Sequence, residues 1–288
     1  MSHRKKTGIT IALSIFICLI GLLGSIAGSL RYAMRDRAIE TLAREWELSQ
    51  MQITKIADRM SMALFFVVMV DTPEIDGEGA ERLLDAEYTR DFVAAKLKDF
   101  RDDLLKKTGK GRIDFDDIAQ LEEEYRDAVT QDLQYSVTPD DMERYETTWD
   151  NLALGQRFIL DTYRNDHPVV FAVARIILSN GFLILTALLT VAAGVGLWFL
   201  TGHSFRGHRA YGVALLIIGI ADCAMSASCG FMAETVNHIV DMRSNLMTLF
   251  FAPVGQMFLI LGGIYVLLGA ASIVLSVLTR RKKKSARP

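Results

Sequence analysis

The sequence predicts an all-α membrane protein with four transmembrane helices and an extracytoplasmic antiparallel helical bundle inserted between spans one and two. Three observations predict it. Four apolar runs each have the roughly 20 residues needed to cross a hydrocarbon core. The charges are segregated: 31–167 holds 31 Asp or Glu and 19 Lys or Arg, and the rest holds 3 and 13. Apolar residues within 31–167 recur at helical spacing.

This segregation divides the chain into three parts. Residues 1–30 form a cytoplasmic N-terminus and the first transmembrane helix. Residues 31–167 form an acidic extracytoplasmic helical bundle. Residues 168–288 form three further transmembrane helices and a basic cytoplasmic tail.

The four predicted spans are residues 8–30, 176–200, 211–232 and 248–278. Lysine and arginine gather in HRKK, GHSFRGHR and RRKKKSARP, whereas Arg243 is the only base between the last two spans. The positive-inside rule therefore predicts cytoplasmic termini in a plasma membrane. Ser25-Ile26-Ala27 resembles a signal-peptide cleavage site, but the apolar run is too long for one, so an uncleaved anchor is favoured. The lack of glycosylation sequons favours a bacterial protein.

The first outer helix is predicted to continue directly from span one. A heptad pattern typical of a coiled coil runs from Ile39 to Val70 and ends at Asp71-Thr72-Pro73. Two further helices are expected over 80–107 and 115–135. A fourth opens at Thr138, an N-cap followed by Pro139 and two acids.

The sequence predicts neither a metal site nor a cofactor. KKTGKGRIDFDDI, residues 106–118, is similar to a calcium loop, but Lys106 and Lys110 stand where calcium needs oxygen ligands. A glycine turn with Asp114 capping the next helix explains the stretch better. His203 and His208 are two ligands, too few for a site. Without a phosphate loop, nucleophile elbow or zinc motif, we expect neither an enzyme nor a nucleic-acid partner.

Small residues mark the faces on which the spans are expected to pack. In lipid, helices associate through close backbone approach and hydrogen bonds. Span one offers Gly21, Gly24 and Gly28, and span four offers Gly255, Gly262 and Gly269, which recur every seven residues. The neighbour on each face is another span or another copy of the chain.

Asp222, near the middle of span three, is the main candidate for a functional residue. An ionisable group at this depth is costly and should face the bundle interior. The predicted depths place it at the inner end of a polar track that contains Asn180, Gln256, Ser226, Asp222, Thr186 and Thr190. The track either conducts a cation or proton, or Asp222 is a hydrogen-bonded clamp between helices; the clamp is favoured.

Two functions remain open on the sequence alone. The favoured one is a non-enzymatic sensor or accessory subunit whose outer bundle binds a ligand or a partner protein. The alternative is an oligomeric channel or transporter subunit with a polar half-path ending at Asp222. Expected partners are membrane lipid, another membrane protein or a second copy, and a cationic ligand or partner at the acidic outer domain.

Overall fold

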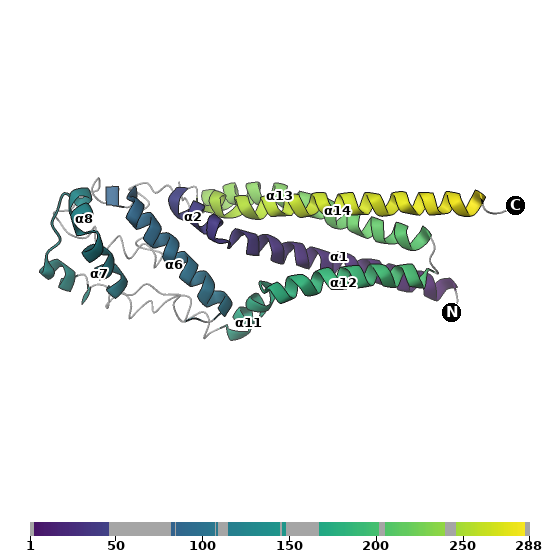
Figure 1. The fold of residues 1–288 in the computed structure, drawn as a ribbon, viewed down its shortest axis with the longest axis horizontal. Coiled ribbons are helices and arrows are strands. Elements are labelled where there is room, and N and C mark those ends of the chain that lie inside the picture. The colour runs from purple at the N-terminus through teal and green to yellow at the C-terminus, as the bar shows by residue number, and fades with distance from the viewer. Residues whose placement is uncertain are drawn as a thin grey trace. The chain divides into compact units, whose positions relative to one another are not determined.

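A computed structural model describes residues 3–45, 82–83, 85–106, 108, 115–144, 146–147, 167–201, 205–239 and 246–285. The regular structure in these ranges is helical (Figure 1). The helices are α1 (His3–Ala33), α2 (Asp36–Glu45), α6 (Glu87–Lys106), α7 (Phe115–Glu124), α8 (Arg126–Leu133), α11 (Pro168–Ile177), α12 (Asn180–Leu200), α13 (Phe205–Ile239) and α14 (Leu246–Ser285).

The chain forms two compact units. A membrane unit comprises 1–33, 176–233 and 251–288, and a second unit comprises 34–175 and 234–250. The second is called the outer unit after the side of the membrane that the sequence predicts for it. Four helices in the described ranges are long and apolar enough to cross a membrane, at 6–33, 180–200, 206–235 and 247–280. The chain is therefore a multi-pass integral membrane protein with a helical segment between spans one and two.

The second span begins later than the sequence predicted. The expected run started at residue 176, but α11 ends at Ile177 and α12 starts at Asn180. Ser179 is extended between them, and its hydroxyl accepts a hydrogen bond from the Phe182 backbone N–H at 3.1 Å. The apolar run is thus two helices, because an N-cap serine interrupts it.

The packing of α13 on α14 is backbone against backbone. A Cβ on Gly219 would lie 2.8 Å from the Gly262 carbonyl oxygen, and one on Gly212 would lie 2.8 Å from that of Gly269. Glycine recurs at a seven-residue interval on both of these antiparallel helices, so no side chain keeps the two backbones apart at these positions.

In the outer unit, α2 and α6 pack together (Figure 1). Buried apolar residues of α2, α6, α7 and α8, together with Leu83, form one core. This core contains Ala43, Leu83, Val93, Ala94, Ile118, Leu121, Val129 and Leu133. Tyr88 and Tyr125 stack with ring centroids 5.0 Å apart. Apolar burial of this kind is the main force that holds helices together outside the bilayer.

The first outer helix is not continuous with span one. A turn at Met34–Arg35 separates α1 from α2, although the sequence predicted one long helix. The Arg101 side chain donates to the Met34 carbonyl at 3.2 Å. A carbonyl that accepts this bond outside the helical ladder is typical of a helix end. The predicted heptad pattern beyond Glu45 lies outside the described residues.

The later outer helices differ from the prediction mainly at their ends. The helix expected at 80–107 is α6, and the one expected at 115–135 is two helices, α7 and α8, with Tyr125 between them. The predicted cap at Thr138 is confirmed. Its hydroxyl accepts the Asp141 backbone N–H at 3.2 Å, and Asp141 accepts the Thr138 backbone N–H at 2.9 Å, which makes a reciprocal capping box.

Candidate functional site

Asp222 lies in the interior of the membrane unit, where its side chain is completely buried. The Ser25 hydroxyl of α1 donates a hydrogen bond to Asp222 Oδ2 at 2.7 Å. Ser25 is itself 1% exposed. A buried hydroxyl-to-carboxyl bond across two helices is the kind of polar contact that fixes helices in lipid.

A third helix completes this site. Tyr265 of α14 lies near both Asp222 and Ser25. A Cβ on Gly262 of α14 would lie 3.2 Å from Asp222 Cβ, so the absence of a side chain at Gly262 makes room for the aspartate. The site therefore consists of Ser25, Asp222 and Tyr265, from α1, α13 and α14.

The second carboxyl oxygen of Asp222 is the unusual feature of the site. Asp222 Oδ1 is buried and has no hydrogen-bond partner among the described residues. A buried polar atom without a partner costs free energy, commonly about 1–3 kcal/mol. The Ser29 hydroxyl, one turn along α1 from Ser25, is also buried without a partner in the described ranges. Asp222 Oδ1 and the Ser29 hydroxyl can therefore each form a further hydrogen bond.

The predicted polar track is distributed differently in the structure. Asn180 and Gln256 are exposed. Ser226 donates its hydroxyl to the Gly255 carbonyl at 2.7 Å, which joins α13 to α14. Thr186 and Thr190 are buried, but their hydroxyls donate within α12, to Leu183 and Thr186 carbonyls. None of these residues forms a recorded hydrogen bond to Asp222.

The structure places the predicted packing glycines against neighbouring helices. An added Cβ on Gly21 would lie 2.5 Å from Ile218 of α13, and one on Gly24 would lie 2.9 Å from the Thr186 hydroxyl of α12. Gly28 lies near α12 and α14. On α14, Gly255, Gly262 and Gly269 lie against α13. These contacts are all within one chain.

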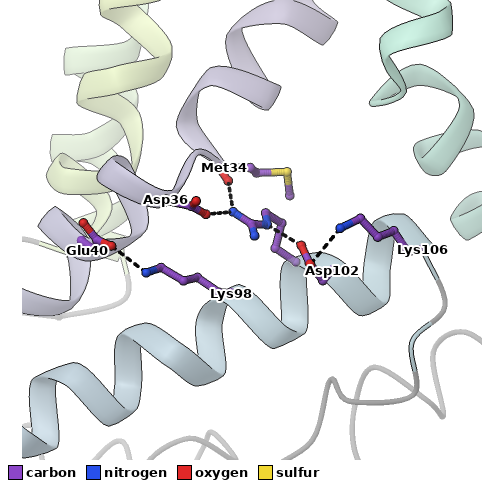
Figure 2. Close-up of polar contacts among 7 residues, drawn as sticks. Met34, Asp36, Glu40, Lys98, Asp102 and Lys106 are labelled. Atoms are coloured by element: carbon purple, nitrogen blue, oxygen red, sulfur yellow. Dashed lines mark hydrogen bonds and ion pairs between the residues drawn. The ribbon is translucent and has the colours of Figure 1, made fainter.

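The outer unit contains a second polar cluster, which joins Asp36 and Glu40 of α2 to basic residues of α6 (Figure 2). Arg101 pairs with Asp36 at the start of α2, and its Nε donates to Asp102 at 2.8 Å. Lys106 also pairs with Asp102, at 2.9 Å, and Lys98 pairs with Glu40 of α2 at 2.6 Å. Basic residues on α6 therefore hold acidic residues on α2.

These ion pairs change the titration of the acids. The hydrogen bond and charge of Arg101 lower the pKa of Asp36. Hydrogen bonds from Lys106 and Arg101 lower the pKa of Asp102. A carboxylate whose partner is a nearby cation remains ionised to lower pH.

Arginines also bind the carbonyl ends of two outer helices. Arg90 of α6 donates to the Ala43 carbonyl at 3.4 Å and to that of Arg44, at the end of α2. Arg175 donates to the Leu104 carbonyl, near the end of α6, at 3.3 Å. A cation is favourable at a helix C-terminus because it meets the negative end of the dipole. Arg175, which the sequence placed at the outer end of span two, lies in α11, in the same unit as Leu104.

No group of three or more His, Cys, Asp or Glu side chains in the described ranges is arranged to hold a metal ion. No protein-family model, curated protein or solved structure matches the chain.

Two residues of the membrane site were missed by the sequence analysis. Ser25 was considered only as part of a cleavage-site pattern, although it lies at mid-span. Tyr265 also lies near the middle of its span, whereas tyrosines in membrane helices concentrate at the interfaces. A polar residue at the same depth as Asp222 was the available signal for both.

Proposed function

We propose that the protein is a non-enzymatic membrane sensor or accessory subunit, whose outer helical segment binds a ligand or a partner protein. The observation that carries this proposal is the attachment of α6 to α2. Arg101 and Lys98 of α6 pair with acids of α2, and Arg90 binds the end of α2. Since α2 follows α1 after a turn at Met34–Arg35, a displacement of α6 is passed to the first span through the chain itself.

The membrane site fits the same proposal. Asp222 is bonded to Ser25 and enclosed by α14, an arrangement that joins three helices. Asn180 and Gln256 are exposed and Ser226 bonds to Gly255, so these predicted track residues, as the structure describes them, do not connect Asp222 to the surface. These contacts favour a clamp between helices over a conduit.

The proposal is tested by purification from the native membrane in a mild detergent. We expect a second membrane protein to be recovered at a fixed molar ratio. High salt should release a partner held by the acidic outer segment, because surface charges are screened at about 1 M ionic strength. A partner held by the spans stays bound in salt. A preparation with neither a partner nor a bound ligand would contradict the proposal.

The second candidate is an oligomeric channel or transporter subunit. The observation that favours it is the unpartnered oxygen Asp222 Oδ1, since intramembrane acids often mark ion or proton pathways. The tests are the mass of the detergent-solubilised protein and cation or proton flux in liposomes. A ring of six or more copies and flux lost in Asp222→Asn would support a pore. Absence of flux in wild type and variant alike would exclude transport under those conditions.

A further inference from the structure

A groove of about 690 Å³ opens on the surface of the membrane unit between α1 and α13. Its floor is the contact between these helices, where the Cys18 thiol lies 3.7 Å from the Ala214 carbonyl oxygen. The groove residues follow helical spacing on both helices, so one continuous face of each contributes. The groove is thus part of the packed bundle.

Three arginines surround one end of the groove: Arg206 and Arg209 of α13, and Arg280 of α14. Arg206 and Arg209 lie one turn apart on the same face. Because α14 is antiparallel to α13, Arg280 comes to the end at which α13 begins. All three side chains are exposed, and no acid lines the groove within the part of the chain that the structure describes.

The rest of the groove is apolar and open. Ile15 and Leu19 of α1 are 55% and 58% exposed, and Val213 and Ile217 of α13 are 43% and 51% exposed. From Arg206 to Ile217 the helix rises about 16 Å. That is about half of a 30 Å hydrocarbon core, the depth of one leaflet. The arginines therefore lie at headgroup level when the apolar face lies at acyl-chain level.

We propose that this groove binds one anionic diacyl phospholipid, with its phosphate among Arg206, Arg209 and Arg280 and its acyl chains against α1 and α13. Arginine pairs with phosphate through planar, often bidentate hydrogen bonds. Basic pockets between membrane helices are suited to anionic headgroups. The site goes beyond the proposed sensor or accessory role and does not depend on it.

Charge disfavours the other simple occupant, a second copy in the same orientation. The residues of this chain at the same end of the bundle are themselves basic, in RGHR and RRKKK. A parallel copy would bring positive charge against the three arginines, which is unfavourable. A soluble phosphate would satisfy the arginines but would leave the apolar face uncovered.

The test is native mass spectrometry of the full-length protein with equal amounts of phosphatidylglycerol and phosphatidylcholine that carry the same acyl chains. We expect retention of phosphatidylglycerol over phosphatidylcholine. Arg209→Gln should lower phosphatidylglycerol occupancy about fivefold, the effect of one basic residue near an anionic headgroup. Lys6→Gln is the matched control, because Lys6 is exposed on α1 outside the groove lining, and should leave occupancy unchanged.

A second arm tests the acyl-chain contacts. Val213→Trp fills the groove without altering charge and should also reduce phosphatidylglycerol occupancy; if it fails to fold, Leu19→Gln replaces it. Excess glycerol phosphate should not displace the lipid. Equal retention of the two lipids, an equal loss in Lys6→Gln, or full displacement by glycerol phosphate would overturn the proposal. A dimer that excludes lipid and is broken by Val213→Trp would assign the face to a second copy instead.

Discussion

The membrane unit and the outer unit bring helices together with different groups. Between α13 and α14 the contact is bare backbone at Gly212, Gly219, Gly262 and Gly269. Between α2 and α6 the contact is made by long charged side chains, such as Lys98 with Glu40 (Figure 2) and Arg101 with Asp36. Apolar helices gain no hydrophobic free energy when they associate in lipid, so the free energy of association must come from close packing. Water screens charge, so the ion pairs add to an apolar core that already exists.

The largest effect on stability is expected when one methyl group is added to the α13–α14 contact. In Gly262→Ala the new Cβ would lie 2.9 Å from the Gly219 carbonyl oxygen, which is backbone and cannot rotate away. We expect a loss of about 1–3 kcal/mol, the usual cost of overpacking. Thermal unfolding in detergent, followed by circular dichroism, measures it.

Gly263→Ala is the matched control for this change. Nothing lies within 4 Å of a Cβ at Gly263, and the helix is the same. Alanine favours helix over glycine by about 1 kcal/mol, so this variant should be neutral or more stable. Equal destabilisation of both variants would mean that the close approach is not what holds the pair.

In the outer unit, the largest single effect is expected at Asp141. It is 8% exposed and accepts hydrogen bonds from Thr138 and from the Tyr135 hydroxyl, the latter at 2.8 Å. Burial alone raises the pKa of Asp141, but these hydrogen bonds outweigh it and lower the pKa. Asp141→Ala should cost about 1–2 kcal/mol, the value of a good cap.

Hydrogen exchange of the amides around residue 141 checks this prediction. The neighbouring acid Asp140 is exposed, and Asp140→Ala removes the same charge without the cap. If the two variants exchange alike, the effect comes from net charge rather than from the capping box.

A smaller effect in the membrane unit distinguishes Ser25 from Ser29. Ser25→Ala removes the bond to Asp222 and should cost about 0.6 kcal/mol, the average for polar contacts between membrane helices. Ser29→Ala removes a buried hydroxyl that has no partner in the described ranges and should be neutral or stabilising. Thermal unfolding of both proteins in one detergent makes the comparison; a larger loss in Ser29→Ala would contradict the assignment.

The Asp222 side chain allows a further comparison at the same site. Asp222→Asn keeps an acceptor for Ser25 and should retain stability, whereas Asp222→Leu loses it. The same thermal unfolding measurement applies. Equal loss in both variants would show that the charge, rather than the hydrogen bond, is needed.

The smallest expected effect is at the α2–α6 ion pairs. Arg101→Gln should lower the free energy of unfolding by less than about 1 kcal/mol. Lys106→Gln should lower it by less still, because the Lys106 side chain is 65% exposed. The pKa values of Asp36 and Asp102 are lowered in the folded state, so their stabilisation is present above the unfolded value near 4. It is lost as the pH falls further, through the folded values.

Hydrogen exchange of α2 across pH 3–6 and at high salt measures this contribution. In wild type the protection of α2 should fall at acid pH and in salt, and Arg101→Gln should remove much of that dependence. Protection in α13 and α14, where contact is backbone, should not respond to salt. Equal salt sensitivity in both units would remove the contrast between them.

The sequence alone predicted the features that depend on residue type and on regular spacing along the chain. Hydropathy predicted four apolar helices, helical spacing predicted further helices between spans one and two, and residue type predicted the Thr138 cap. The interruptions between helices were not predicted, because the turn at Met34–Arg35 and the cap at Ser179 lie within sequence patterns that look like one continuous helix. Their partners, Arg101 for the Met34 carbonyl and the Phe182 N–H for Ser179, determine the break.

The site was predictable in its centre but not in its partners. Burial of Asp222 follows from its chemistry, because a carboxyl cannot face lipid cheaply. The choice of Ser25 over Ser226 depends on how α1 and α13 rotate about their axes. That rotation is set by glycine contacts such as Gly21 with Ile218, which depth along the membrane does not reveal.

The regular spacing of glycines on α13 and α14 also carries a risk for assembly. A slide of one helix by seven residues, about 10 Å, would again set glycine against glycine. Steric fit alone therefore accepts more than one alignment. In the observed alignment the glycine contacts coincide with two hydrogen bonds, from the Ser226 hydroxyl to the Gly255 carbonyl at 2.7 Å and from the Ser272 hydroxyl to the His208 carbonyl at 2.9 Å. In this hairpin the glycines set how closely the helices approach, and the serine hydroxyls add hydrogen bonds between the two helices at that distance.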